Sequence, residues 1–386
     1  MPAAIKYLRR AISALLLTAA LAACERRSLE YYYRPTCRVV LNVDWSHLTE
    51  TPTGMSAFFY KDGGDVPIVI NTDEVNSTGV DLPEGHWKCF VMNYGPDEYF
   101  YFLEFAGMYG ADPYGAEAFL RQTRSRWYVS SKADVRAGVD ASAVGFEPEN
   151  LAIALAEEFD ITKDMVEKYQ AQYADWKTKT KTKTKSSKAE DDVTESKNRL
   201  DGLTYYINTV AYSAISELNV RVYIQGIYNL YSARASMDGL AENYLLYAGH
   251  PGTAEVVQLL ESETWVRTVD SSDPTKGYIE NSIKVLGLPG ILPDDLSTRA
   301  PELNTFGLSC LLVDRTTQCD FDFPVGDKFS VELGIHGIKL SLNLVLGSID
   351  DPGVTLPDVP PAGDSSGGMD AVVDDWETGE TVEIPM

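Results

Sequence analysis

The chain has 386 residues, with 33 lysine and arginine residues against 57 acidic residues, so its formal net charge is −24 at pH 7. This charge excludes nucleic acid as an expected ligand, because binding to phosphates requires clustered lysine and arginine. It also argues against peripheral binding to anionic lipid. The length is sufficient for two domains of ordinary size.

The N-terminus has the three parts of a signal peptide. A basic region with Lys6, Arg9 and Arg10 comes first, an uncharged apolar run at 11–22 follows, and small residues precede Cys24. The apolar run is too short for a permanent membrane span, and no later segment reaches the ~18 apolar residues that a span requires. The sequence therefore predicts export.

The residues Leu-Ala-Ala-Cys at 21–24 resemble the lipobox of bacterial lipoproteins. In that class the cysteine receives a diacylglyceryl group, and cleavage frees its amine for a third acyl chain. Each buried methylene contributes roughly 0.8 kcal/mol, so several chains hold a protein at a membrane better than one. We predict a lipoprotein signal peptide at 1–23, lipidation of Cys24 and a tether at 24–36. A plain signal peptide before a chance cysteine is the alternative.

Four cysteine residues remain once Cys24 carries lipid, namely Cys37, Cys89, Cys310 and Cys319. An even number in an exported chain is compatible with two disulfides. Pairing Cys37 with Cys89 and Cys310 with Cys319 would keep each bond within one predicted domain. Four buried thiols that act as small apolar residues are the open alternative.

A β-rich N-terminal domain is predicted over 37–176. Strands are expected at 37–45, where apolar and polar residues alternate, and at 55–60, 66–70 and 80–93. Short strands at this spacing are typical of a β-sandwich. A helix is expected near 116–123 and another at 163–176, whereas 151–159 fits a buried strand or the start of a helix. The aromatic stretch from Tyr94 to Tyr109 fits either a core or a platform for sugars and partners.

Residues 177–188 read KTKTKTKTKSSK and contain no apolar residue. Such a segment cannot bury a core, so we predict a disordered Lys/Thr-rich linker over 177–199 and place the domain boundary there. A basic tail for nucleic acid is the alternative. The acidic residues Glu190, Asp191 and Asp192 follow at once and disfavour it.

A second β-sandwich domain is predicted over 200–349. Residues 220–226 alternate like a strand, and 237–247 fits a short helix or a strand. Further strands are expected at 306–313, 320–323, 329–335 and 339–346. Residues 350–386 are predicted to form a Pro/Gly/Asp-rich loop and a closing strand.

We find no motif of an enzyme, a metal site or a cofactor site in the sequence. The histidines stand far apart, at His47, His86, His250 and His336, and the acidic pairs are of the kind that arises by chance in so acidic a chain. We therefore expect no enzyme activity and no small-molecule cofactor. A hydrolase with scattered active-site residues is the alternative.

Several segments taken together resemble Bacteroidales-type fimbrial anchor lipoproteins, the FimB-like, minor-fimbria-anchor group. After the lipobox, RVVLNVDW at 38–45 and GMSAFFY at 54–60 resemble the first two strands of that family. VDLPEGHW at 80–87 resembles its turn and strand, and the segment 367–376 resembles its closing strand. The similarity is weak over 96–200, and the lysine-rich segment departs from the family pattern.

The resemblance implies a mainly β chain with two tandem transthyretin-like β-sandwich (Greek-key) domains and some helical insertions. It also implies a lipid-anchored protein on the outer membrane, exposed at the cell surface, that holds or caps a fimbrial polymer. The partners would be fimbrial subunits, contacted by strand exchange at a sheet edge. A non-fimbrial surface lipoprotein that binds glycan or protein ligands is the alternative function.

Overall fold

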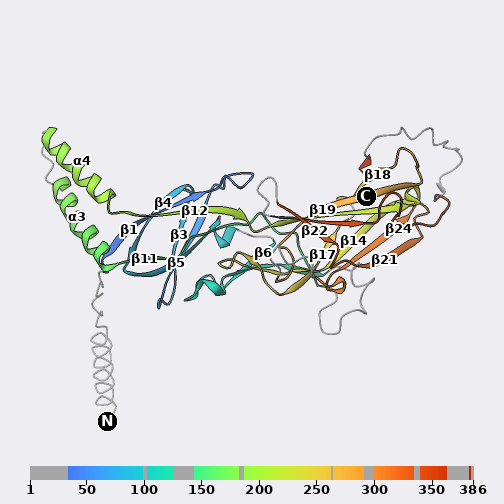
Figure 1. The fold of residues 1–386 in the computed structure, drawn as a ribbon, viewed down its shortest axis with the longest axis horizontal. Coiled ribbons are helices and arrows are strands. Elements are labelled where there is room, and N and C mark those ends of the chain that lie inside the picture. Colours follow the sequence, from blue (N-terminus) through green and yellow to red (C-terminus); the bar gives the residue numbers. More distant parts are fainter. Residues whose placement is uncertain are drawn as a thin grey trace, which may run out of the picture. The chain divides into compact units, whose positions relative to one another are not determined.

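The structure is a computed structural model that describes residues 34–98, 102–124, 143–181, 187–261, 264–290, 299–333, 340–362 and 382–383. Residues from Thr36 onward form one compact unit. The fold is mainly β, as predicted (Figure 1). The predicted signal peptide and Cys24 lie outside the described residues.

The first sheet is built from the strands that the sequence predicts in its N-terminal part, with later strands added. Its members are β1 (Thr36–Asp44), β2 (Met55–Lys61), β3 (Ile68–Thr72), β4 (Ser77–Pro83), β5 (Gly85–Asn93), β10 (Ala152–Leu155), β11 (Phe159–Ile161) and β12 (Tyr205–Ser213). Their order is β3-β2-β5-β10-β12-β1-β4, with β11 paired to β5. The predicted strands in this part are therefore confirmed, and residues 151–159 contain β10 and the start of β11 rather than a helix.

Burial explains why the strands of this sheet differ in sequence. Strand β1 alternates between buried and half-buried side chains, because only one of its faces contacts a core. Strand β2 is buried on both faces. Ala57 and Phe59 belong to one core and Phe58 and Tyr60 to the other, so the strand reads as a continuous apolar run.

A small sheet covers the second face of β2 and β5. It consists of β6 (Leu103–Ala106), β7 (Glu117–Leu120), β15 (Asn243–Leu245) and β16 (His250–Pro251), and short 3-10 helices lie nearby at Pro96–Glu98 and Pro113–Gly115. The predicted helix near 116–123 is wrong. Ala116 and Ala118 are fully buried, and pairing of β7 with β6 and β15 outweighs the helical propensity of the segment.

Two further sheets enclose most of the larger core, which is the core that contains Phe58 and Tyr60. One has the order β22 (Phe329–Leu333), β23 (Leu340–Leu346), β13 (Ser216–Gln225), β19 (Lys276–Val285), β18 (Val266–Val269) and β25 (Val382–Glu383), with β24 (Val354–Thr355) on β13. The other has the order β21 (Gln318–Pro324), β20 (Thr305–Leu312), β14 (Leu230–Ala241), β17 (Glu255–Leu260), β9 (Ala143–Gly145) and β8 (Gln122–Arg124). Short 3-10 helices lie at Ile227–Asn229 and Pro301–Leu303. The strands predicted in this part are confirmed, and residues 237–247 contain the end of β14 and all of β15 rather than a helix. The segment 367–376, which resembles the family's closing strand, lies outside the described residues, and β25 is the described part of the chain after residue 362.

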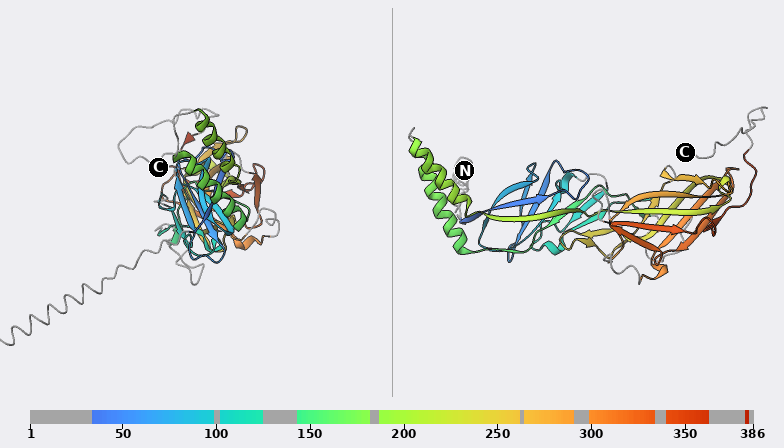
Figure 2. Two further views of the ribbon diagram at one scale, coloured as in Figure 1. Left: turned by 90° about the vertical axis from the view of Figure 1, so that its left-hand side faces the viewer. Right: turned by 45° about the horizontal axis from the view of Figure 1, so that its top comes forward.

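Two helices, α3 (Lys163–Lys181) and α4 (Ser187–Asp201), form a hairpin beside β1 (Figure 2). The helix predicted at 163–176 is confirmed. The predicted disorder is wrong for the described part of 177–199, because both helices extend into it. Neither described helix has an apolar stretch long enough to cross a membrane.

Local interactions explain why the lysine-rich segment continues a helix. Val166 and Tyr169 anchor the start of α3 in the core of the first sheet. Further along, Thr178 and Thr180 donate hydrogen bonds to the carbonyls of Ala174 and Trp176, and a salt bridge of 2.8 Å joins Lys179 to Asp175. Lysine itself has a good helix propensity, so the missing apolar residues cost little once the helix has begun.

Strand β12 does not follow the predicted domain boundary at 199/200. It pairs in parallel with β1 and antiparallel with β10, so residues 205–213 belong to the first sheet. Conversely, β7 and β9 from the N-terminal part pair with β15 and β17 from the C-terminal part. The division into two sandwich domains and their transthyretin-like topology therefore stay predictions.

Candidate functional site

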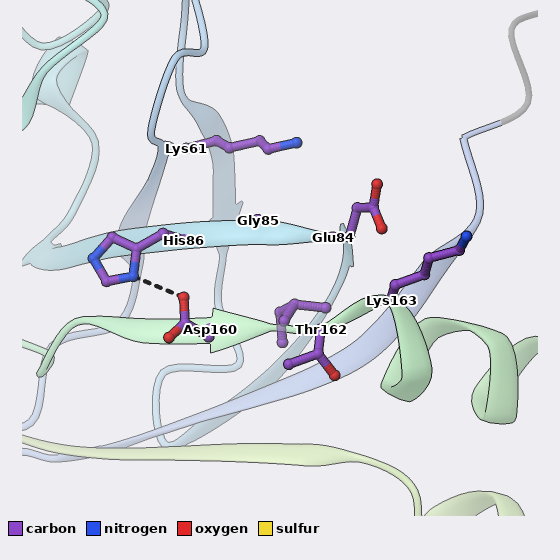
Figure 3. Close-up of a pocket in the computed structure, with 8 residues that line it drawn as sticks. Lys61, Glu84, Gly85, His86, Asp160, Thr162 and Lys163 are labelled. Carbon is purple, nitrogen blue, oxygen red and sulfur yellow. Dashed lines mark hydrogen bonds and ion pairs between the residues drawn. The ribbon is translucent and has the colours of Figure 1, made fainter.

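A surface pocket of about 490 Å³ lies where β5 and β11 pair. Strand β11 places Asp160 opposite His86 and Ile161 opposite Gly85. The lining side chains come from β2, β5, β11 and the start of α3 (Figure 3), among them Lys61, His86, Asp160, Thr162 and Lys163. The pocket therefore collects charged and hydroxyl groups from four elements.

The backbone conformation at position 85 favours glycine, and the Lys61 side chain lies close to it. The φ of Gly85 is +153°, and a Cβ atom at this position would lie 2.3 Å from Cε of Lys61. The turn predicted from Pro83 and Gly85 is therefore also the place where the aliphatic part of the Lys61 side chain lies beside the pocket. Any larger residue at 85 would displace that side chain.

His86 is bonded through both ring nitrogens. Nδ1 lies 2.9 Å from Oδ1 of Asp160, and Nε2 lies 3.0 Å from Oε2 of Glu158. The hydrogen bonds to Glu158 and to Asp160 raise the pKa of His86 above its usual value, because both carboxylates favour the imidazolium. His86 thereby fastens β5 to β11 and to the segment that precedes it.

Two tyrosines and a lysine extend this network. The hydroxyl of Tyr247 lies 3.4 Å from Oε1 of Glu158, and the rings of Tyr247 and Tyr114 meet edge to face at 4.9 Å. Nζ of Lys88 lies 5.5 Å from the centre of the Tyr114 ring and 3.3 Å from Oδ1 of Asp62. The result is a polar surface with an exposed aromatic ring, which is suited to contact with another molecule.

The arrangement is poorly suited to acid–base catalysis. A histidine with both nitrogens bonded to carboxylates has no free lone pair with which to accept a proton from a substrate. Within the described ranges, no group of three or more histidine, cysteine or acidic side chains could hold a metal ion. We therefore interpret the site as a structural clamp between β5 and β11, beside a polar surface with an exposed aromatic ring.

The structure places the predicted cysteines in two different situations. All four thiols are free, and Cys37, Cys89 and Cys310 are buried. Cys37 lies on β1 and Cys89 on β5, and β10 and β12 separate these strands in the sheet. Cys310 and Cys319, in contrast, are direct partners in the antiparallel pair β20–β21.

The two other histidines that the structure describes, His47 and His250, make separate contacts. The ring of His47 lies 4.8 Å from that of Tyr212, and Nδ1 of His250 lies 2.7 Å from the carbonyl oxygen of Pro251. His336 lies outside the described residues. Sequence reasoning missed the partners of His86, because Glu158 and Asp160 are more than seventy residues away in the chain. Only the predicted strand near 151–159 could have indicated them.

The described residues of the aromatic stretch from Tyr94 to Tyr109 mostly make packing contacts. Phe105 and Tyr94 pack against the larger core, and Phe102 contacts Phe146 with ring centres 5.2 Å apart. Tyr109 is 58% exposed, although its ring meets that of Phe58. No continuous aromatic platform is evident among the described residues of the stretch.

Residues 23–261 match a family described as a domain of unknown function, DUF5119, and the chain belongs to that family. No curated protein matches the sequence. Among solved structures, the chain is similar to a candidate adhesin from Bacteroides ovatus, with 16% identity, 87% of this chain and 98% of that chain covered, and a TM-score of 0.48.

Two proteins of Porphyromonas gingivalis are also similar. One is the fimbrial anchor protein Mfa2, with 9% identity, 80% of this chain and 90% of that chain covered, and a TM-score of 0.40. The other is the tip fimbrial protein Mfa3, with 9% identity, coverage of 75% and 81%, and a TM-score of 0.25. Fimbrial anchor and tip proteins are thus among the structures to which this chain is similar.

Proposed function

We propose that this chain is a non-enzymatic, lipid-anchored surface protein that holds or caps a fimbrial polymer at the outer membrane. The observation that carries the proposal is the sequence before Cys24, in which a basic region, an apolar run and Leu-Ala-Ala lead directly to the cysteine. Lipid on Cys24 fixes one end of the protein to the membrane. The β-rich unit that follows is then free to bind a partner.

The edges of the sheets support a partner contact through main-chain hydrogen bonds. Strand β22 ends its sheet and, among the described residues, pairs only with β23. Along β22 the side chains alternate, with Phe329 buried, Ser330 exposed, Val331 half-buried and Glu332 exposed. An edge strand of this kind can accept one more strand from a fimbrial subunit, whose side chains would fill the half-buried side.

The membrane half of the proposal is tested by Cys24→Ala. In the native host this variant should lose labelled fatty acid and either leave the membrane fraction or remain an uncleaved precursor. Cys89→Ala is the matched control, because it removes a thiol outside the lipobox and should keep both label and location. A Cys24→Ala protein that retains its acyl label and its membrane location would refute lipidation at this residue.

The fimbrial half is tested in the host and by purification. Deletion of the gene should leave fimbriae that are shed or altered in length, and the purified lipidated protein should bring down fimbrial subunits. Normal, attached fimbriae in the deletion strain would contradict the anchor role and favour the binding function described next.

The second candidate function is the binding of glycan by a surface lipoprotein, and one sheet face favours it. On β12 the rings of Tyr206 and Tyr212 are 54% and 45% exposed. Between them, Ser77, Asn42 and Asn208 form a hydrogen-bonded row across β4, β1 and β12, with distances of 2.7 and 2.9 Å. Aromatic faces flanked by uncharged amides match the apolar faces and hydroxyl groups of sugars.

A glycan array distinguishes this second candidate from the anchor role. If the face binds sugar, Tyr206→Ala with Tyr212→Ala should abolish any binding that the wild-type chain shows. The control is Tyr109→Ala, which removes an equally exposed tyrosine from another part of the surface. Loss of binding in the control alone would place the sugar elsewhere.

A further inference from the structure

The β20–β21 hairpin brings two thiols to the same place on one sheet face. Cys310 on β20 and Cys319 on β21 are direct Cα partners in the antiparallel register. Side chains at such positions point to the same face, and their Cα atoms are about 4.5 to 5.5 Å apart. Disulfides join residues whose Cα atoms are about 4.4 to 6.8 Å apart, so the register alone makes this pair competent to form a bond.

The turn between the strands fixes this register. The amide of Leu312 donates to the carbonyl of Thr317 at 2.9 Å, and the amide of Arg315 donates to the carbonyl of Leu312 at 2.8 Å. The Asp314 carboxylate accepts bonds from the amides of Thr316 and Thr317, at 3.1 and 2.9 Å. A slip of one residue would break these bonds and would turn the two cysteine side chains to opposite faces.

The other two cysteines lack such an arrangement. Cys37 and Cys89 lie on strands that are not neighbours in their sheet, and Sγ of Cys37 is 3.6 Å from the carbonyl oxygen of Leu203. Both side chains are fully buried in the core of the first sheet. They therefore behave as small apolar core residues rather than as a second pair.

We propose that Cys310 and Cys319 form a disulfide that joins β20 to β21 in the mature protein, whereas Cys37 and Cys89 stay thiols. The inference rests on the export that the proposed function requires, because exported proteins meet an oxidising environment. Of the two disulfides that the sequence permits, the proposal keeps one and places it between the last two strands at one edge of the six-stranded sheet.

The chemistry needs an external oxidant, which we take to be a dithiol–disulfide oxidoreductase of the cell envelope. Cys319 is half-exposed, whereas Cys310 is fully buried. The thiolate of Cys319 attacks the disulfide of the oxidant, and one oxidant sulfur leaves as a thiolate. The thiolate of Cys310 then attacks Sγ of Cys319 and releases the second oxidant sulfur. Two protein thiols lose two protons and two electrons, and the oxidant gains two thiols.

The bond would fix an edge strand. Strand β21 ends the six-stranded sheet and pairs only with β20 among the described residues, so nothing else in that sheet retains it. Closing a loop of about ten residues favours the folded state by up to roughly 100-fold in the unfolding equilibrium. A linked β21 is also difficult to displace from this edge of the sheet.

The direct test is a disulfide map of the full chain from its native host. Cells are quenched in acid, the protein is unfolded, free thiols are blocked with N-ethylmaleimide, and the unreduced digest is analysed by mass spectrometry. The expected result is a linked pair of peptides with Cys310 and Cys319, and blocked Cys37 and Cys89. Blocked Cys310 and Cys319, or a linked Cys37–Cys89 pair, would overturn the proposal.

The same digest separates this inference from the proposed function, because it also contains the N-terminal peptide. A linked pair in chains without acyl groups on Cys24 would refute the anchor and leave the disulfide standing. Chains that carry acyl groups on Cys24 but have four blocked thiols would refute the disulfide and leave the anchor standing.

Hydrogen exchange of the purified chain gives a second test that does not depend on the host. After oxidation with glutathione disulfide, the amides of β21 should exchange at least about tenfold more slowly than in Cys310→Ala/Cys319→Ala. The matched control, Cys37→Ala/Cys89→Ala, should keep the slow exchange. Equal exchange in the oxidised chain and in Cys310→Ala/Cys319→Ala would contradict a bond between the strands.

Discussion

Strands β11 and β21 each pair with a single neighbour among the described residues, but they are held by different forces. In β11 the side chains of Phe159 and Ile161 are buried, and only Asp160 faces the solvent. In β21 exposed residues alternate with half-buried ones, and no side chain is fully buried. A peripheral strand can therefore be retained either by the core beneath it or by its turn and its cross-strand contacts. The two strands should therefore separate from their sheets under different conditions.

The largest effect is expected from Phe159→Ala. Phe159 is 5% exposed, lies opposite Trp87 in the register and stacks on Tyr205 with ring centres 5.4 Å apart. Removing such a side chain typically costs about 3–5 kcal/mol of stability. Urea unfolding followed by fluorescence would measure the loss. A loss below about 1 kcal/mol would show that the core does not retain β11.

A smaller effect is expected from Phe323→Ala on β21. This ring is only half-buried and lies 6.4 Å from that of Phe306. Partial burial suggests a loss of about 1–2 kcal/mol, which the same unfolding experiment would detect. The experiment belongs under reducing conditions, so that no disulfide compensates. A loss as large as that of Phe159→Ala would remove the contrast between the strands.

The ionic clamp of β11 should make its retention dependent on pH. Hydrogen bonds to Glu158 and Asp160 raise the folded-state pKa of His86 above its unfolded value of about 6.5. The stabilisation is therefore complete below about pH 6.5 and is lost as the pH rises through the folded pKa. Thermal unfolding at several pH values should show a decline in wild type that His86→Gln lacks.

His47→Gln is the matched control for that experiment. His47 contacts Tyr212 rather than a pair of carboxylates, so this variant should keep the pH dependence of the wild type. A decline that persists in His86→Gln would assign the effect to other groups. We expect the change to be smaller than that of Phe323→Ala, because the clamp is solvent-exposed.

The smallest effect is expected in the turn that precedes β21. Hydrogen bonds from the side chain and amide of Thr317 lower the pKa of Asp314 to about 2. Its contribution is present above the unfolded value of about 3.9 and is lost as the pH falls through about 2. Asp314→Asn should therefore unfold slightly more easily than wild type at pH 6, with the difference shrinking towards pH 2.

Asp320→Asn serves as the control for the turn, since Asp320 lies on the same hairpin and accepts hydrogen bonds from the side chain of Gln318 rather than from turn amides. It should leave stability unchanged between pH 6 and pH 2 relative to wild type. If both variants behaved alike, the turn bonds of Asp314 would have no special part in the register of β21.

Local patterns predicted most strands, because alternation and turn residues are properties of short segments. The segment 37–45 became β1 and the segment 80–93 became β4 and β5. The sequence could not predict which strands pair when the partners are far apart. Tyr206 and Val40 are opposite each other in β12 and β1, yet no local signal connects them.

Two segments show how tertiary context changes a local preference. Residues 117–120 have a helix-like composition, but pairing with two strands and the full burial of Ala118 make them β7. The lysine-rich segment lacks apolar residues, but α3 continues into it from Tyr169, which is already anchored in a core. Prediction of the candidate site was limited in the same way. The sequence shows His86 without a neighbouring partner, because the pairing of β5 with β11 is what brings its carboxylates close.

The position of β12 between β1 and β10 has a consequence for the timing of folding. Strand β1 begins at Thr36, but its parallel partner ends at Ser213, so the first sheet cannot close until more than two hundred residues have been synthesised. Pairing over such a distance is slow, because the intervening chain must be ordered before the contact forms. A chain that is translocated from its N-terminus would therefore remain incompletely folded through more than half of its passage. This delay would keep it in a state that a secretion channel can pass.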